Sequence, residues 1–319
     1  MESDSTISES SVCCPHCTAR MRAMRPRGEY RSSPVTRYVG QCGRHSPQPT
    51  HVTRSSSAIP NEWPTVVTHP TVPFTTTYNA DMNFDPISVF DEMSARLGAL
   101  AEADPERKIE ACPGWASNDV IRHLGSVYAM VSAIMAAEST EFLKPGPEAE
   151  PPSSGLLSWF HERRRVLRDL LARTDPELPL WTWGADASAN FYRRRMVHET
   201  CIHLGDIERS SGTEPNVTRD ISLDGIDEFF ETVLPFGLKR RAAAPPAKSL
   251  HLHSTDGPGE WMIRTTDGII TTTHEHAKGD VAWRGSATHL YFAVWGRWSA
   301  PIEELGDAEG SREWRSIAP

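Results

Sequence analysis

One segment of the chain combines a carboxylate and an imidazole at a spacing that suits metal binding. Glu199 and His203 are four residues apart in the segment 192–206, which has a helical pattern. An α-helix turns about 100° per residue, so the two side chains lie on one face, one turn apart. Both can reach one divalent cation, and three protein ligands plus a water form the usual open catalytic site. Since one helix supplies only two ligands, the third must come from elsewhere, and His123 is the best candidate.

Two other interpretations of this segment compete with a metal site. His198 and Glu199 begin a pattern close to the zinc-protease motif H-E-x-x-H, but His203 comes one residue too late. The two histidines therefore lie on different helix faces. Glu199 and His203 could also be an ordinary surface pair, which spacing alone does not exclude. Asp206 lies near the ligand face, whereas Cys201 is rotated about 200° from His203 and is expected to pack in the core.

Amphipathic periodicity predicts the helices that must hold these side chains. Apolar residues recur every three or four positions over residues 84–102, 117–138, 154–173 and 187–211. Ser117 is expected to cap the second helix, and Gly212 to end the fourth. His123 lies in the second helix beside its apolar face, where a lone histidine can equally be a satisfied core residue. Four helices of this length predict a bundle, whose core is a usual place for a metal site.

In the last third of the chain, the period with which apolar residues recur changes from that of a helix to the two-residue period of a strand. A fifth helix is expected from Asp224 to Leu234, and residues 242–248 have the composition of a linker. Strands are then predicted at 250–253, 260–264, 269–273 and 280–284, followed by a helix over 286–296. Asp256-Gly257 and Asp267-Gly268 are turn signals, and Ser286 is the expected helix cap. The fold class is therefore α+β, a four-helix bundle followed by a small α/β C-terminal domain.

Two pairs of histidines accompany these strands. His251 and His253 are two residues apart, as are His274 and His276, which places each pair on one face of a strand. Each pair could bind a metal, but half-exposed sheet positions next to turns are the favoured interpretation.

Residues 1–81 differ in composition from the rest. They are rich in Ser, Thr, Pro and Arg and lack helical or strand periodicity, so we expect a disordered extension. Alternatively, they precede a functional start at Met82. Cys13, Cys14, His16 and Cys17 could bind zinc only with a second half-site that the segment lacks, and no site is predicted there. The expected boundaries are 1–81 for the extension, 82–240 for the bundle and 248–319 for the C-terminal domain.

Composition excludes several classes of protein. The 319-residue chain has a net charge of −9, which argues against binding to nucleic acid. No apolar run approaches the roughly 20 residues that span a bilayer, and the N-terminus lacks the pattern of a secretory signal. We therefore expect a cytoplasmic protein with reduced cysteines and without nucleic-acid or membrane partners. The oligomeric state is left open.

Several of these segments together resemble a known family. They are Cys112-Pro-Gly-Trp115, the helix of His123, the segment 195–203, Asp224-Gly-Ile-Asp-Glu and the stretch 253–261. In this order they are similar to the mycothiol-dependent maleylpyruvate isomerase family, and the resemblance covers about Phe84 to Pro319. It implies a DinB-like metal-binding bundle and a C-terminal domain akin to sterol-carrier proteins.

The resemblance also implies a site. It makes His123, Glu199 and His203 the metal ligands, with zinc as the expected metal, although these ligands do not exclude nickel, cobalt or iron. It further implies an arginine of the C-terminal domain in catalysis. Arg297 is the first candidate and Arg284 the second.

The implied function is thiol chemistry on a small electrophilic substrate. Mycothiol would be the thiol cofactor, and coordination to the metal would favour its nucleophilic thiolate. Addition to an unsaturated acid, bond rotation and elimination would give an isomerase, whereas release of the adduct would give a transferase. The alternative, from another class, is a non-catalytic metal-binding bundle with a binding or regulatory role.

Overall fold

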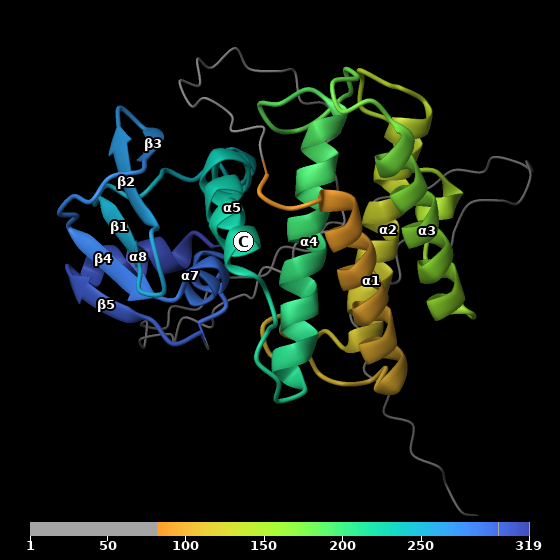
Figure 1. Ribbon diagram of the computed structural model, residues 1–319, viewed down its shortest axis with the longest axis horizontal. Helices are drawn as coiled ribbons and strands as arrows, with labels where there is room; N and C mark the ends of the chain where they lie inside the picture. Colours follow the sequence, from red (N-terminus) through yellow and green to blue (C-terminus); the bar gives the residue numbers. More distant parts are fainter. Residues whose placement is uncertain (1–81, 299, 319) are drawn as a thin grey trace, which may run out of the picture. The chain divides into compact units, whose positions relative to one another are not determined.

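The computed structural model describes residues 82–298 and 300–318 of the chain. These residues all belong to one structural unit. They form a group of helices followed by a mixed sheet with two further helices (Figure 1), which confirms the predicted α+β class. The expected extension of residues 1–81, with its Cys13–Cys17 cluster, lies outside the described residues. Within the described ranges, no helix combines the length and the apolar character that crossing a bilayer requires.

Four long helices form the first part of the described chain. They are α1 (Pro86–Ala103), α2 (Ser117–Ala136), α3 (Leu156–Arg173) and α4 (Ala189–Ser210), with the short 3-10 helix η1 (Pro147–Ala149) before α3. Helix α1 packs against α3 and α4, and α2 packs against the same two helices, as Figure 1 shows. The large side chains buried between them include Phe90, Tyr128, Phe160 and Tyr192.

The ends of two helices test the predicted capping residues. The prediction that Ser117 caps α2 was wrong, because Ala116 is the N-cap residue. The Asp119 carboxylate accepts the Ala116 N–H at 2.9 Å, so an acidic residue in the first turn satisfies this amide without a serine. Helix α4 ends as predicted, with Ser211 as C-cap and Gly212 beyond it at φ 79°.

The fifth helix is longer than its apolar pattern indicated. Helix α5 (Arg219–Glu228), a π-helical turn η2 (Phe229–Val233) and α6 (Leu234–Arg241) follow one another without a break. The last turn of α6 is basic, with Lys239, Arg240 and Arg241. Cations at this end are favoured by the helix dipole, a stabilising interaction that apolar periodicity does not register.

The C-terminal part is a five-stranded sheet in the order β3-β2-β1-β4-β5. Its strands are β1 (Leu250–Ser254), β2 (Glu260–Thr266), β3 (Ile269–Thr273), β4 (Val281–Gly285) and β5 (Glu303–Gly306). Strands β1 and β4 are parallel, and the other neighbours are antiparallel. Asp267 and Gly268 have φ values of 52° and 76°, as the predicted tight turn between β2 and β3 requires.

Two helices complete this part, α7 (Ala287–Val294) and α8 (Ala308–Ser316). Ser286 caps α7 as predicted, its hydroxyl accepting the His289 N–H at 3.2 Å. Strand β5 and helix α8 were missed. Both are short and mostly exposed, and in α8 Trp314 is the one large apolar side chain, so neither has a clear apolar period.

The sheet turns one face toward the helices. Leu252, Trp261 and Trp283 are aligned across three strands. The Trp261 indole N–H donates to Asp227 of α5 at 2.6 Å, and that of Trp283 donates to Ser311 of α8 at 2.9 Å. On the opposite face Arg284 and Leu305 are exposed, whereas His251 and Met262 are buried, so this face is only partly open to solvent.

The predicted pairing of His274 with His276 on one strand face was wrong. Strand β3 ends at Thr273, and both histidines lie beyond it. His274 Nε2 is 3.2 Å from Asp227 of α5, whereas His276 Nδ1 is 3.1 Å from Glu260 of β2. Without strand geometry, a spacing of two residues does not place two side chains on the same side.

Candidate metal centre

The three predicted ligands lie together on two neighbouring helices. His123 comes from α2, and Glu199 and His203 come from α4. His123 Nε2 is 2.8 Å from Glu199 Oε1, and His203 Nε2 is 3.8 Å from the same oxygen. Their ligand atoms all lie within 4.8 Å of one another. Two ligands about 2.1 Å from a tetrahedral zinc ion are about 3.4 Å apart, so a metal would fit among these atoms with small side-chain shifts.

The site lies in the helical core. The side chains of His123, Glu199 and His203 are 7%, 15% and 4% exposed, which excludes an ordinary surface pair. The Trp115 ring stacks on that of His203, with centroids 5.9 Å apart and planes 19° from parallel. It also lies 5.4 Å from the His123 ring. The indole therefore covers both imidazoles and limits the access of water to them.

A buried ion pair sets the orientation of the His203 ring. His203 Nδ1 lies 3.1 Å from Asp206 Oδ2, and Arg297 donates to both Asp206 oxygens, at 2.9 Å and 2.7 Å. Burial raises the pKa of Asp206, but the Arg297 charge and the His203 hydrogen bond outweigh it and leave the pKa below its ordinary value. Asp206 is therefore a carboxylate that can only accept, so His203 Nδ1 donates and its Nε2 presents a lone pair toward Glu199.

Glu199 is fixed in a similar way. Its Oε2 accepts from Arg195 of the same helix, and Arg195 also donates to Glu228 of α5 at 2.5 Å. Burial raises the pKa of Glu199, but the Arg195 charge and the His123 hydrogen bond outweigh it and leave the pKa well below its usual range. Glu199 is therefore ionised, and its Oε1 faces the two histidines.

These contacts leave Glu199 Oε1 facing the Nε2 atoms of both His123 and His203. A proton shared by His123 Nε2 and Glu199 Oε1 would satisfy those two atoms, but His203 Nε2, 3.8 Å from the carboxylate, would lack a donor. Burial lowers the pKa of His203, and together with nearby His123 it outweighs the Asp206 hydrogen bond, which raises the pKa. The result favours the neutral imidazole that binds metals. A divalent cation would satisfy all three atoms, so the residues present fit a metal ion.

The two candidate arginines occupy different places. Arg297 is buried behind Asp206, and its Nη1 donates to the Trp295 carbonyl at 2.7 Å. Arg284 is exposed on the sheet, where it pairs with Glu303 at 2.9 Å. Arg297 therefore reaches the three-residue group through Asp206 and His203, and Arg284 is directed to solvent.

Sequence reasoning assigned no role to two residues of the turn before α2, Cys112 and Trp115. Cys112 Sγ is 3.7 Å from Asp206 Oδ2 and 3.9 Å from Arg297 Nη2. Burial and the Asp206 charge raise the pKa of this thiol to about 12, so it stays protonated near neutral pH. Both residues lie in a turn without periodicity. The available signal was that Cys112-Pro-Gly-Trp115 immediately precedes the helix of His123.

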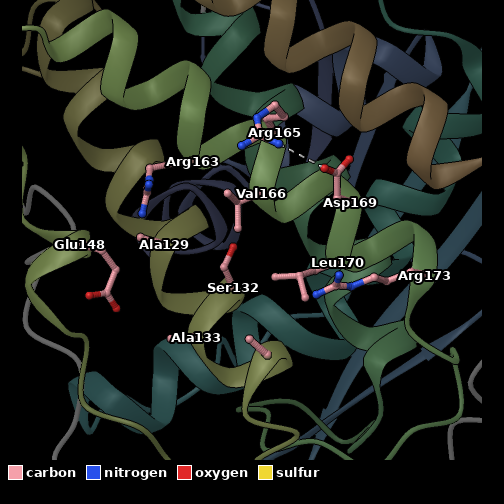
Figure 2. A pocket seen from close by; sticks show the side chains of 11 residues that line it. Ala129, Ser132, Ala133, Glu148, Arg163, Arg165, Val166, Asp169, Leu170 and Arg173 are labelled. Atoms are coloured by element: carbon pink, nitrogen blue, oxygen red, sulfur yellow. Dashed lines mark ion pairs between the residues drawn. The ribbon is translucent and has the colours of Figure 1, made fainter.

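A surface pocket between α2 and α3 is separate from this site. It has a volume of about 370 Å³, and the described residues that line it include none of the three candidate ligands. Figure 2 shows its charged side chains, among them Arg165 and Asp169, which are 3.5 Å apart. The pocket therefore gives no route to the candidate metal centre.

Comparison with known proteins bears on the helical part. Residues 88–208 match the family described as the mycothiol maleylpyruvate isomerase N-terminal domain. Two solved structures are similar, the mycothiol-dependent maleylpyruvate isomerase with a TM-score of 0.48 and a histidine-to-alanine mutant of it with 0.47. Each is 14% identical to this chain, over 70% of this chain and 92% of the solved one. No curated protein matches the chain.

The family match extends from α1 almost to the end of α4, so it includes His123, Glu199 and His203. The segments on which the resemblance rested at its N-terminal side fall within the same range. Residues 88–208 of this chain are therefore similar to mycothiol maleylpyruvate isomerase N-terminal domains.

Proposed function

We propose that this protein is a metal-dependent, mycothiol-using isomerase or thiol transferase that acts on a small electrophilic substrate. The convergence of His123 Nε2, Glu199 Oε1 and His203 Nε2 carries the proposal. Three protein ligands leave a coordination position for an exchangeable fourth ligand, as in catalytic zinc sites. When bound there, a divalent cation such as zinc would favour the thiolate form of a thiol near neutral pH.

The chain's own residues prepare these ligands. Asp206 keeps the proton of His203 on Nδ1 and so leaves Nε2 free, while Arg297 holds Asp206 in place. Arg195 occupies Oε2 of Glu199 and directs Oε1 toward the histidines. Partners of this kind fix the tautomer and direction of metal ligands, and their loss typically weakens metal affinity 10- to 100-fold, on the order of 1–3 kcal/mol.

The nucleophilic thiol is expected to come from a small molecule. Among the described residues, the free cysteines are Cys112 and Cys201. Burial raises the pKa of each thiol to about 12, so neither is a thiolate near neutral pH. Mycothiol, named in the description of the matched family, would supply this group.

The proposed reaction needs no net oxidant or reductant. The thiolate adds to the double bond of an unsaturated acid such as maleylpyruvate, which leaves a single bond about which the adduct can rotate. Expulsion of the same thiolate restores the double bond in the other geometry and regenerates the thiol. If the adduct instead takes up a proton at carbon and leaves, the protein is a transferase.

Arg297 is a positioning residue in this proposal. Its Nε, Nη1 and Nη2 atoms all donate to Asp206 or to the Trp295 carbonyl. To clamp a substrate carboxylate it would have to release Asp206, which would leave a buried carboxylate without its ion-pair partner.

Metal content and thiol-dependent turnover of the purified full-length protein test the proposal. We expect the wild type to hold one more metal equivalent than His123→Ala or Glu199→Ala, and to convert maleylpyruvate only when mycothiol is present. Equal metal content in the three proteins, purified without chelators, would contradict it. Metal without thiol-dependent turnover would favour the alternative, a non-catalytic metal-binding bundle. The ion pair between Arg297 and Asp206 is compatible with that alternative. Cytoplasmic location stays a prediction.

A further inference from the structure

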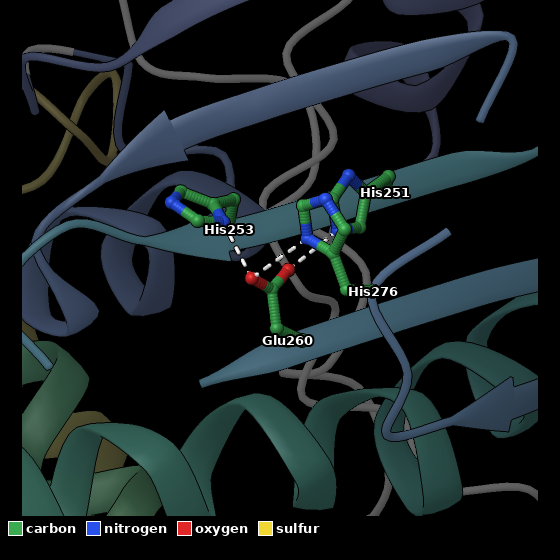
Figure 3. Close-up of side chains that lie close together, drawn as sticks. All are labelled: His251, His253, Glu260 and His276. Atoms are coloured by element: carbon green, nitrogen blue, oxygen red, sulfur yellow. Dashed lines mark hydrogen bonds and ion pairs between the residues drawn. The ribbon is translucent and has the colours of Figure 1, made fainter. Parts of the chain in front are cut away.

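Three histidines and a glutamate gather on the face of the sheet opposite the row of Leu252, Trp261 and Trp283. Figure 3 shows His251 and His253 on β1, Glu260 at the start of β2, and His276 in the segment after β3. One ligand atom of each lies within 4.8 Å of those of the others. The cluster shares no residue with the candidate metal centre of the helices.

Glu260 is the common partner of the three imidazoles. Its Oε2 is 2.6 Å from His251 Nε2. Its Oε1 is 2.6 Å from His253 Nδ1 and 3.1 Å from His276 Nδ1. The three ring centroids are 5.3 to 6.2 Å apart, so three ring nitrogens are directed at one small volume beside the carboxylate.

The sheet positions three of these four side chains. Alternation along β1 places His251 and His253 on the same face, and the antiparallel register places Glu260 directly opposite His253. His276 comes from the irregular segment between β3 and β4. His251 is buried, His253 and Glu260 are half-buried, and His276 is exposed, so the cluster is open to ions from solution.

Hydrogen bonding alone poorly explains the position of the His276 side chain beside Glu260. Its side chain is 76% exposed, and Glu260 already has a histidine on each oxygen. Fixing an exposed ring on that carboxylate costs side-chain entropy, while water could make the same hydrogen bond. Three imidazoles and a carboxylate, by contrast, are a full tetrahedral ligand set, whose donors lie about 3.4 Å apart around zinc. Small rotations of His276 and Glu260 would bring the cluster to that spacing.

We propose that His251, His253, Glu260 and His276 form a second metal site, which binds a divalent transition metal such as Zn²⁺, Co²⁺ or Ni²⁺. Imidazole donors select such ions over Mg²⁺ and Ca²⁺, which prefer oxygen ligands. A metal at this site ties β1 and β2 to the segment that leads into β4, and so stabilises the sheet. His274 is outside the site, because it contacts Asp227 of α5.

Titration of metal-free, full-length His123→Ala protein with Co²⁺ tests this proposal, since that variant lacks one ligand of the helical centre. We expect one equivalent of Co²⁺ to bind with the visible absorption of tetrahedral cobalt, and to be displaced by Zn²⁺ but not by Mg²⁺. Adding His276→Ala should weaken binding at least about 100-fold, beyond the 10- to 100-fold typical of lost outer-shell partners. Adding His274→Ala, the matched control two residues away, should leave binding unchanged.

Absence of Co²⁺ binding by His123→Ala, or equal affinities after His276→Ala and His274→Ala, would overturn the proposal. Should His123→Ala not fold, the wild type provides the same comparison. Its Co²⁺ stoichiometry should then fall by one equivalent in His276→Ala and stay unchanged in His274→Ala. The titration uses neither thiol nor substrate, so its outcome is independent of the proposed enzymatic function.

Discussion

At the scale of single residues, the pair of Asp206 and Arg297 links a distant part of the chain to a metal-ligand candidate. Arg297 lies 91 positions after Asp206, yet it donates to both oxygens of this carboxylate. The carboxylate in turn accepts from His203. A planar guanidinium makes this two-point contact, which an ammonium group cannot reproduce.

Arg297→Lys should therefore weaken metal binding by the helical centre about 10-fold or more, because Asp206 and then His203 lose their fixed orientation. Competition with a chelator measures this affinity. Arg284→Lys, at an exposed position of the sheet, is the matched control and should bind metal like the wild type. Unchanged metal affinity together with a raised KM in Arg297→Lys would instead assign Arg297 to substrate binding.

At the scale of secondary-structure elements, close packing keeps α4 against α7, the helix that precedes Arg297. A Cβ atom on Gly205 of α4 would lie 2.3 Å from the ring of Phe292 in α7. No L side chain fits there without a shift of the aromatic ring, so the approach of the two helices depends on this glycine.

Gly205→Ala should lower the free energy of unfolding by about 1–3 kcal/mol, the usual cost of overpacking a core. Urea denaturation measures the change. The control is Gly237→Ala in α6, where the nearest atom to an added Cβ is 3.6 Å away and belongs to the flexible Arg241 side chain. There alanine should be neutral or stabilising by up to about 1 kcal/mol, as a better helix former. Equal losses in the two variants would contradict the packing argument.

A buried polar network joins α4 to α5. Asp224 of α5 accepts from His198 Nε2 at 2.6 Å and from Arg194 Nε at 3.0 Å. Burial raises the pKa of Asp224, but the His198 hydrogen bond and the Arg194 charge outweigh it and leave the pKa below its ordinary value of 3.8. Folding therefore favours the carboxylate form. Its contribution to stability is complete above the ordinary pKa and is lost as the pH falls through the folded value.

Asp224→Asn should consequently be less stable than the wild type at pH 7 and should lose less further stability on acidification from about pH 5 to pH 3. Unfolding free energies measured across this range test the prediction. Asp267→Asn, in the exposed β2–β3 turn, should follow the wild-type curve, because asparagine also tolerates the positive φ there. Parallel pH curves for Asp224→Asn and the wild type would show that this carboxylate does not couple folding to pH.

At the scale of the whole molecule, the two metal sites that we propose among the described residues differ in character. The helical centre has two imidazoles and one carboxylate in the core, whereas the sheet cluster has three imidazoles and one carboxylate that range from buried His251 to exposed His276. The domain boundaries 82–240 and 248–319 stay a prediction, and the ion pair between Asp206 and Arg297 crosses them.

A chain that begins at Met82 contains every helix and strand of the described structure. It should therefore fold without residues 1–81, with a cooperative unfolding transition by circular dichroism, and bind Co²⁺ at the two proposed sites. A loss of either property would assign residues 1–81 a part in folding or metal binding.

The sequence by itself determined the features that depend only on residues close together in the chain. Apolar periodicity located the four long helices and four of the five strands, since 3.6- and two-residue periods follow directly from local backbone geometry. The same geometry placed Glu199 and His203 on one face of a helix. Prediction from local patterns failed for β5 and α8, where the apolar pattern was weak. It also failed at the start of α2, where Asp119 rather than Ser117 accepts a hydrogen bond from a backbone N–H.

Only the tertiary structure decided which distant side chains meet. His123 lies 76 positions from Glu199, and the packing of α2 against α4 brings their atoms to 2.8 Å. It also distinguished Arg297 from Arg284, and placed His276 rather than His274 beside His251 and His253. The physical reason is that such contacts depend on how helices and strands pack, and many packings are compatible with one local pattern.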